Sequence, residues 1–319
     1  MNFLKEEGMP LHPEVARDLE QNPIPRNFSP TVEEMRAADW DMPLEQRTKI
    51  DKISNDYVKN NTYEIPVRIY EYKDDGKIKP VIIFFHGGGF VRCSVETHDD
   101  MCRNLAKHTG WKVISPEYRL APEYKFPVPL EDCCRVVEWT AENAGQLRID
   151  PKRIAVCGDS AGGNLAGAAA KKFKNNGKIK ISKQILIYPV IDFYSKNSEI
   201  KYESYKKYSW GYGLSSSSMH RYWDFYLGNK EDENNIYASL SKDNNLFGLP
   251  ETFIICSEYD PLSDEARHYA ECLEKASVRV KFVRYSGLNH AFMHALPHLE
   301  ECCEIYNSIS DFLNKGKKL

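Results

Sequence analysis

The sequence predicts an α/β protein with a mostly parallel, doubly wound sheet, and three observations predict this class. Several short runs rich in Val, Ile and Phe lack polar alternation, which is typical of strands covered on both faces. Helix-length segments separate these runs, and such a repeat implies right-handed crossovers between parallel strands. The 319 residues are 42% hydrophobic and 28% charged, which is the composition of an ordered globular chain.

Strand and helix candidates alternate through the middle and end of the chain. The expected buried strands are Val81–Phe85, Val113–Ser115, Ile154–Cys157, Ile185–Tyr188, Thr252–Cys256 and Val280–Tyr285. The expected helices are Thr97–His108, Leu130–Ala144, Ala161–Lys174, Asp264–Lys275 and Glu300–Leu313. An earlier alternating run, Tyr63–Tyr72, is expected to begin the sheet as antiparallel edge strands.

Two regions interrupt this alternation and are interpreted as caps. Residues 1–50 carry helical stretches around a Pro-rich link and no strand candidate. Residues 192–246 are rich in aromatics, and Ser215–Ser218 is expected to cap a helix over Met219–Leu227. We therefore expect residues 51–191 and 247–319 to form the α/β core. The two caps should cover the carboxyl ends of its strands, where ligands bind in such folds.

A nucleophile candidate follows the strand Ile154–Cys157. Gly158-Asp159-Ser160-Ala161-Gly162 matches G-x-S-x-G between a predicted strand and a predicted helix. In that context the sharp turn exposes Ser160 at a helix N-terminus, and small neighbours let the chain pass closely. A Gly-rich turn that merely packs a helix is the alternative.

A second Gly-rich segment, His86-Gly87-Gly88-Gly89-Phe90, follows the strand Val81–Phe85. Three consecutive glycines cost chain entropy, so bare backbone should be needed there. The N–H groups of Gly88 and Gly89, with that of Ala161, are candidates for stabilising an oxyanion. A phosphate-binding loop is the competing interpretation, but no Lys follows the glycines at the required spacing.

The acid and base candidates come after two later strands. Hydrolases with a G-x-S-x-G turn carry their catalytic residues in the chain order Ser, Asp, His, and the candidates follow this order. Asp260 directly follows Thr252–Cys256, and His290 follows Val280–Tyr285, so both should reach the crevice that holds Ser160. Glu258 and Asp264 are rivals of Asp260, which has the shorter route from the strand end. The recurrence of His290, His294 and His298 could suggest a metal face, but Pro297 argues against one unbroken helix. We expect no metal.

Composition excludes several other classes of function. The formal net charge of −3 and the lack of a long basic block argue against a nucleic-acid partner. No apolar run approaches the ~20 residues of a membrane span, and Met1–Glu7 lacks the layout of a signal peptide. Nine cysteines without a Cys-x-x-Cys pattern are interpreted as reduced thiols of a cytoplasmic protein.

With these residues in place, the sequence resembles the hormone-sensitive-lipase-like family of carboxylesterases over residues 60–315. Five motifs in the same order carry the resemblance. They are His86–Phe90, Tyr118–Glu123 followed by Phe126-Pro127, Gly158–Asn164, Glu258–Glu265 and Gly287–Phe292. The amino-terminal segment near Met9 also resembles the family's cap.

The resemblance implies an α/β-hydrolase fold with about eight strands and a helical cap. It implies Ser160 as nucleophile, Asp260 and His290 as its partners, and no cofactor. His86 and Gly87 would shape the loop that presents the oxyanion donors. Two departures stand out: Ala291 replaces the family's usual Gly after the catalytic His, and Ser239-Leu240-Ser241 stands where Ser-Pro-Leu is common. Neither removes a catalytic group.

The predicted reaction is hydrolysis of a small-molecule ester, with short acyl or aryl groups, through an acyl-enzyme. Candidates for the substrate pocket are Phe90, Asp159, Trp210 and Tyr212, although most cap aromatics are expected simply to pack the cap. An amidase or peptidase on the same fold is the alternative enzyme, and a non-catalytic small-molecule receptor is the alternative class. Relatives often dimerise through an edge strand, so a homodimer stays open.

Overall fold

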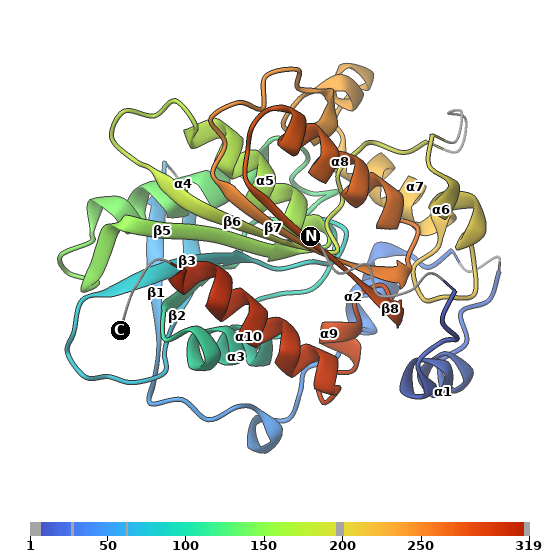
Figure 1. Cartoon of the computed structure of the whole chain (residues 1–319), viewed down its shortest axis with the longest axis horizontal. Helices are drawn as coiled ribbons and strands as arrows, with labels where there is room; N and C mark the ends of the chain where they lie inside the picture. The colour runs from blue at the N-terminus through green and yellow to red at the C-terminus, as the bar shows by residue number, and fades with distance from the viewer. Residues whose placement is uncertain (1–7, 27–28, 62, 196–200, 316–319) are drawn as a thin grey trace.

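An eight-stranded sheet runs through the middle of the molecule with helices on both faces (Figure 1). The structure is a computed structural model that describes residues 8–26, 29–61, 63–195 and 201–315. The strands are β1 (Lys52–Asn60), β2 (Tyr63–Glu71), β3 (Lys79–Phe85), β4 (Lys112–Pro116), β5 (Ile149–Asp159), β6 (Ile181–Ile187), β7 (Glu251–Tyr259) and β8 (Val280–Asn289). Their order across the sheet is β1-β2-β4-β3-β5-β6-β7-β8. The predicted fold class is confirmed.

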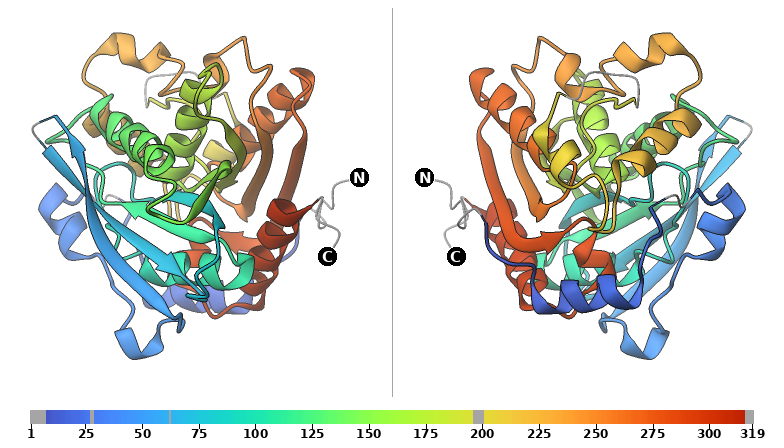
Figure 2. Two further views of the ribbon diagram at one scale, coloured as in Figure 1. Left: turned by 90° about the vertical axis from the view of Figure 1, so that its left-hand side faces the viewer. Right: turned by 90° about the vertical axis from the view of Figure 1, so that its right-hand side faces the viewer.

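The sheet is parallel except at one edge. β2 pairs antiparallel with both β1 and β4, and the five pairings from β4 through β3 to β8 are parallel. The two side views show the first and last strands at opposite edges and rotated relative to each other, which is the usual twist of such a sheet (Figure 2). Because β5 lies at the centre, the residue that follows it meets loops from both neighbouring sides.

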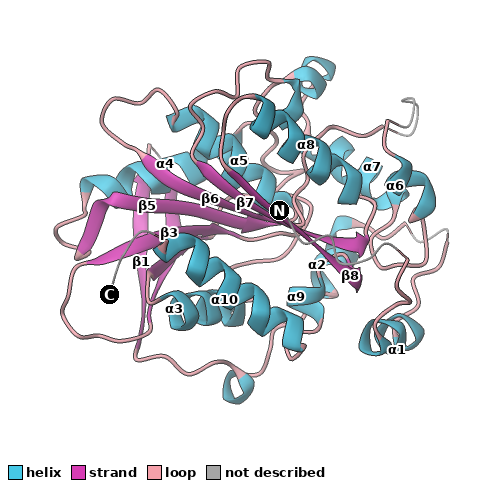
Figure 3. Cartoon of the chain, in the orientation of Figure 1, coloured by secondary structure: helices cyan, strands magenta, loops and turns pink. Residues whose placement is uncertain are grey.

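Helices cover both faces of the sheet (Figure 3). α4 (Val128–Glu142), α5 (Ala161–Phe173) and α8 (Ser263–Lys275) lie on one side, and α3 (Asp99–Thr109) and α10 (Glu300–Asn314) on the other. Alternate residues of β3 enter two separate cores. Ile83 and Phe85 pack with the first set of helices, whereas Ile82 and Phe84 pack with the second. This double burial explains why the central strands show no polar alternation.

The predicted strands lie close to the observed ones, and one observed strand was not expected. β1 (Lys52–Asn60) was not expected as a separate strand, because its sequence is mostly polar and only Val58 is buried. Its register with β2 is set by pairing along its whole length, from Lys52 opposite Glu71 to Asn60 opposite Tyr63. Edge strands of this kind carry a weak hydrophobic signal.

The two predicted caps contain helices and no strand within the described residues. Before the sheet lie α1 (Pro13–Gln21), α2 (Val32–Ala37) and the 3-10 turn η1 (Leu44–Gln46). Between β6 and β7 lie α6 (Glu203–Lys207), α7 (Ser216–Tyr226) and the 3-10 turns η2 (Lys230–Asn234) and η3 (Leu240–Lys242). The predicted serine cap of α7 is present: the Ser215 side chain accepts the Ser218 N–H at 3.1 Å. These helices gather toward the carboxyl ends of the strands (Figure 1).

Two further findings concern the expected absences. Across the residues that the structure describes, no helix has both the length and the apolar character needed to cross a bilayer. All nine cysteines are unpaired thiols. Residues 1–7, interpreted above as lacking a signal peptide, lie outside the described residues.

Candidate active site

Ser160 occupies the sharp turn between β5 and α5. Its backbone has φ 54° and ψ −119°, a strained combination for a residue with a side chain. Glycines make the turn possible. A Cβ at Gly158 would lie 2.2 Å from the carbonyl oxygen of Gly162, and one at Gly162 would lie 1.9 Å from the carbonyl oxygen of Phe85. The backbone N–H of Ser160 donates to Ile187 at 2.8 Å, which fixes the turn to the next strand.

His290 and Asp260 reach this serine from the ends of the last two strands. His290 Nε2 lies 2.9 Å from Ser160 Oγ, and His290 Nδ1 lies 2.7 Å from Asp260 Oδ2. Asp260 is fully buried, and its other oxygen accepts the N–H of Leu262 at 2.8 Å. The ring of Tyr188 meets the imidazole edge-on, with centroids 5.1 Å apart. The three side chains predicted from the sequence therefore form one hydrogen-bonded chain.

The Gly-rich loop after β3 carries Gly88 and Gly89, two of the three predicted oxyanion donors. Gly88 and Gly89 have φ of 106° and 63°, values that favour glycine. The Gly88 carbonyl closes the turn by accepting the N–H groups of Val91 and Arg92 at 3.1 and 3.0 Å. Among the described residues, no hydrogen bond uses the N–H of Gly88, Gly89 or Ala161. These three N–H groups therefore have no protein acceptor within the described residues.

His86 supports the base of this loop. It is fully buried, its ring stacks on Tyr118 at 4.3 Å, and its carbonyl accepts the Tyr118 hydroxyl at 2.7 Å. Burial and the neighbouring His98 lower the pKa of His86 to about 3. A neutral, buried imidazole fits the loop-shaping role implied by the resemblance.

Asp159 also supports the loop instead of facing an open pocket. It is 2% exposed, and its Oδ1 accepts the Gly87 N–H at 2.8 Å. A Cβ at Gly87 would lie 2.6 Å from the other oxygen of Asp159, so this glycine is required for the close approach. Burial by itself raises the pKa of Asp159, but the charge and hydrogen bond of His98 outweigh burial and hold that pKa below its ordinary value. The substrate-pocket role predicted for Asp159 is not supported by these contacts.

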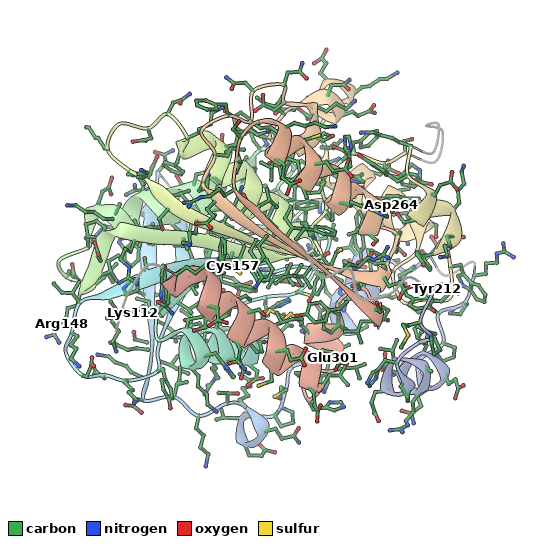
Figure 4. The ribbon with its side chains drawn as sticks, in the orientation of Figure 1. Lys112, Arg148, Cys157, Tyr212, Asp264 and Glu301 are labelled. Carbon is green, nitrogen blue, oxygen red and sulfur yellow. The ribbon has the colours of Figure 1, made fainter. Side chains whose placement is uncertain are left out.

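The other pocket candidates occupy three different settings. Phe90 is 1% exposed and stacks on Tyr226 of α7 at 3.8 Å, so it joins the loop to the cap. Trp210 is 45% exposed, and its Nε1 donates to the carbonyl of Ile24. Tyr212 lies on the cap side of the molecule, well away from Cys157 in the middle of the sheet (Figure 4). Of the four, Trp210 and Tyr212 retain exposed surface that a substrate could contact.

The rival acids have structural partners of their own. Glu258 is buried and bridges two segments, since its carboxylate accepts the N–H groups of Gly8 at 2.8 Å and Gly287 at 3.1 Å. Asp264 accepts the N–H of Ser204 from α6 at 2.9 Å. Sequence reasoning missed both roles because each contact joins positions at least 29 residues apart.

The rival histidines diverge as well. α9 spans only Phe292–Ala295, His294 stacks on His98 at 4.8 Å, and the side chain of His298 is 64% exposed. In the part of the chain that the structure describes, no group of three His, Cys, Asp or Glu side chains is placed to share a metal ion.

The N-terminal cap contacts the Gly-rich loop through charged side chains that sequence reasoning also missed. Asp39 accepts from Arg92 Nε at 2.6 Å and from the Cys93 N–H at 2.9 Å. Arg36 donates to the carbonyl of Val91 at 2.9 Å. Three consecutive residues after the glycines are therefore held by one segment of the cap.

Comparison with known proteins identifies the family. A sequence profile of the α/β-hydrolase fold matches residues 82–294, which is most of the chain. The chain belongs to the hormone-sensitive-lipase-like α/β-hydrolases. This hydrolase is 35% identical over 240 residues to an arylesterase from Saccharolobus solfataricus, with 74% of this chain and 75% of that protein covered. It is 32% identical to an ethyl acetate hydrolase from Pseudomonas putida, with 76% of each chain covered.

Solved structures agree with this assignment. A hyperthermophilic esterase from the archaeon Pyrobaculum calidifontis superposes on the hydrolase with a TM-score of 0.85 and 34% identity, covering 96% of this chain and 98% of that one. The similarity thus includes both regions predicted as caps as well as the sheet.

Proposed function

We propose that this protein hydrolyses carboxylic esters with short acyl or aryl groups, using Ser160, His290 and Asp260. One observation carries the proposal: the hydrogen-bonded chain that runs from Asp260 through His290 to Ser160. A serine hydroxyl is a weak nucleophile unless a base is poised to take its proton, and the imidazole at 2.9 Å is such a base. The buried carboxylate fixes the tautomer that leaves Nε2 free to accept.

The first half of the reaction transfers the acyl group to the protein. Ser160 Oγ attacks the ester carbonyl carbon while its proton passes to His290 Nε2. The tetrahedral intermediate collapses, the bond to the alcohol oxygen breaks, and His290 gives its proton to the departing alcohol. An acyl ester on Ser160 and a free alcohol result.

The backbone N–H groups of Gly88, Gly89 and Ala161 are proposed to hold the carbonyl oxygen as it gains charge. They have no partner among the described residues, and Ala161 begins a helix of 13 residues, whose positive end favours an anion. Loss of one such donor typically costs about 10²–10³ in rate. The donors do not need a cofactor to act.

The second half of the reaction releases the acid. Water gives a proton to His290 and attacks the acyl carbon, the oxyanion forms again in the same place, and the proton returns to Ser160 Oγ as the acyl bond breaks. The balance is one ester and one water consumed for one acid and one alcohol formed.

We propose short acyl or aryl substrates on two grounds. Ser160 is only 7% exposed, which favours a compact acyl group over a long chain. The relatives named as an arylesterase and an ethyl acetate hydrolase support the same range. We also propose a cytoplasmic location, because all nine cysteines, including the exposed Cys303, are unpaired thiols.

Hydrolysis of a series of p-nitrophenyl esters from acetate to octanoate tests the proposal. We expect kcat/KM to be highest for the shortest chains and to vanish in Ser160→Ala. Ser54→Ala, an exposed serine on the edge strand β1, serves as the matched control and should keep full activity. Turnover that survives in Ser160→Ala would reject the mechanism. Absence of any turnover would favour a receptor, and equal turnover of p-nitroacetanilide would favour an amidase.

A further inference from the structure

A second buried carboxylate–imidazole pair lies beneath the Gly-rich loop. His98 stands at the N-terminus of α3, is 2% exposed, and places Nε2 3.3 Å from both carboxylate oxygens of Asp159. Its other nitrogen, Nδ1, lies 2.8 Å from Thr97 Oγ1. The reaction proposed above leaves this pair without a role.

The hydrogen bonds around His98 fix the partner of each ring nitrogen. Nδ1 lies against the Thr97 hydroxyl, which is also 2.9 Å from the carbonyl of Ser94. Nε2 lies against the Asp159 carboxylate. An ionised carboxylate can only accept, so this contact uses a proton on Nε2.

Two further imidazoles pack against this ring. His294 stacks on His98 with centroids 4.8 Å apart and planes at 11°, and His86 lies on another side at 5.6 Å. Burial, followed by the influence of His98, lowers the pKa of His294 to about 4 and that of His86 to about 3. Both neighbours are therefore neutral at neutral pH, and His98 alone among the three pairs with the carboxylate.

Asp159 transmits this contact to the loop. The carboxylate that faces His98 also accepts the Gly87 N–H at 2.8 Å and packs against the bare Cα of Gly87. Gly87 immediately precedes Gly88 and Gly89, whose N–H groups are the proposed oxyanion donors. A rotation of the Asp159 side chain would release Gly87 and change the direction of both donors.

We propose that His98 is a positioning residue that acts through Asp159 to aim the Gly88 and Gly89 N–H groups at the substrate oxygen. This inference rests on the proposed function. His98 does not touch the substrate or take its proton. It fixes the carboxylate that fixes the loop, and its contribution should therefore appear in the transition state and not in binding of the ester.

The test compares His98→Leu, which removes the donor and keeps a side chain of similar bulk, with His98→Gln, whose amide can still donate to Asp159. His108→Gln, a half-buried histidine near the other end of α3, is the matched control. The readouts are kcat and KM for p-nitrophenyl acetate and the inhibition constant Ki of a short alkyl trifluoromethyl ketone. That inhibitor forms a tetrahedral oxyanion on Ser160, so its affinity reports on the donors directly.

We expect His98→Leu to lower kcat about tenfold or more and to raise Ki by a similar factor, with KM within about twofold. His98→Gln should recover most of both losses, and His108→Gln should match the wild type. KM and Ki do not depend on the concentration of folded protein, so partial unfolding cannot imitate this pattern. The inference is overturned if Ki is unchanged in His98→Leu, or if Gln and Leu behave alike. Lack of wild-type hydrolysis would instead reject the proposed function itself.

Discussion

Two buried carboxylate–imidazole pairs flank Ser160, and they differ in what the imidazole meets on its far side. In the Asp260–His290 pair the nitrogen that does not contact Asp260 is Nε2, and it faces the hydroxyl of Ser160, a residue in a strained turn. In the Asp159–His98 pair the other nitrogen, Nδ1, faces the Thr97 hydroxyl, which also contacts the carbonyl of Ser94. The first imidazole can exchange a proton with a reacting group, whereas the second is enclosed by Asp159, Thr97 and the rings of His86 and His294.

The difference shows that the residue types alone do not define a catalytic dyad. The side chains of both pairs are largely buried, and each carboxylate lies at the carboxyl end of a parallel strand, because Asp159 ends β5 and Asp260 follows β7. Asp159 precedes Ser160 in sequence, and Asp260 reaches Ser160 through His290. The imidazole of a pair can act as a base where the nucleophile's hydroxyl is within hydrogen-bond distance, as for His290. Where it is not, the pair can only hold neighbouring backbone in place, as Asp159 holds Gly87. Substitutions in each pair should therefore have unequal effects.

The largest expected effect separates the two carboxylates. Asp260→Asn should lower kcat for p-nitrophenyl acetate by about 10⁴, because the imidazole loses the tautomer that can accept the serine proton. Asp159→Asn keeps an oxygen to accept from Gly87 and should lower kcat by about tenfold or less. Steady-state kinetics on both variants measures the contrast, and comparable losses would remove the distinction between the pairs.

The next effect concerns the loop that the second pair supports. Gly89→Ala should lower kcat by about 10²–10³, because its Cβ would lie 2.4 Å from the ring of Tyr222 and the loop would have to move. Gly110→Ala is the control: Gly110 has a similar φ of 70°, with open space around its Cβ. It should cost about 1 kcal/mol of stability and no activity. Equal kinetic losses would show that backbone strain, and not donor placement, is responsible.

A smaller effect appears in the pH dependence of stability. Unfolded His294 takes up a proton near pH 6.5, whereas the folded pKa is about 4. The unfolded state therefore binds more protons between these values, and the free energy of unfolding should fall as pH drops from 6.5 toward 4. Urea unfolding at pH 7.5 and pH 5 should show a smaller drop for His294→Gln than for the wild type. His298→Gln, an exposed histidine, should leave the drop unchanged.

The smallest expected effect concerns Ala291, which lies between His290 and α9, the helix that carries His294. Ala291 has φ 60°, where a Cβ is strained by about 1–2 kcal/mol. Ala291→Gly removes that strain but adds chain entropy to the unfolded state, so unfolding should cost roughly 0.5–1 kcal/mol more. Thermal melting should detect a rise of about 2 °C, with kinetics unchanged. Ala295→Gly, in helical geometry, should shift the melting temperature the opposite way.

Local sequence patterns were enough to predict the nucleophile turn and the parallel strands. Gly158, Ser160 and Gly162 lie within five residues, and their crowding at the turn follows from the order of those residues alone. Asp260 was preferred to Glu258 for its shorter route from the strand end, and the structure places Asp260 2.7 Å from His290. Apolar runs buried on both faces give a strong signal, so the central strands were also accessible.

Contacts between distant segments were not accessible from the sequence. His98 reaches Asp159 across 61 positions, and Asp39 reaches Arg92 across 53, with no periodicity that would link them. Asp159 was predicted as a pocket residue, whereas its carboxylate contacts the Gly87 N–H and His98. β1 was missed because its stability comes from pairing with β2, and its own side chains are mostly polar and exposed.

The contacts between residues 8–12 and strands β7 and β8 affect the order in which the protein can fold during synthesis. The Gly8 N–H bonds Glu258, the Tyr259 hydroxyl bonds the carbonyl of Met9, and the His12 N–H bonds the carbonyl of Gly287. Some 250 residues of synthesis separate the partners in the first two contacts. During translation the segment around Gly8 leaves the ribosome long before residues 258–287 are made, so these bonds can form only after β7 and β8 have been synthesised.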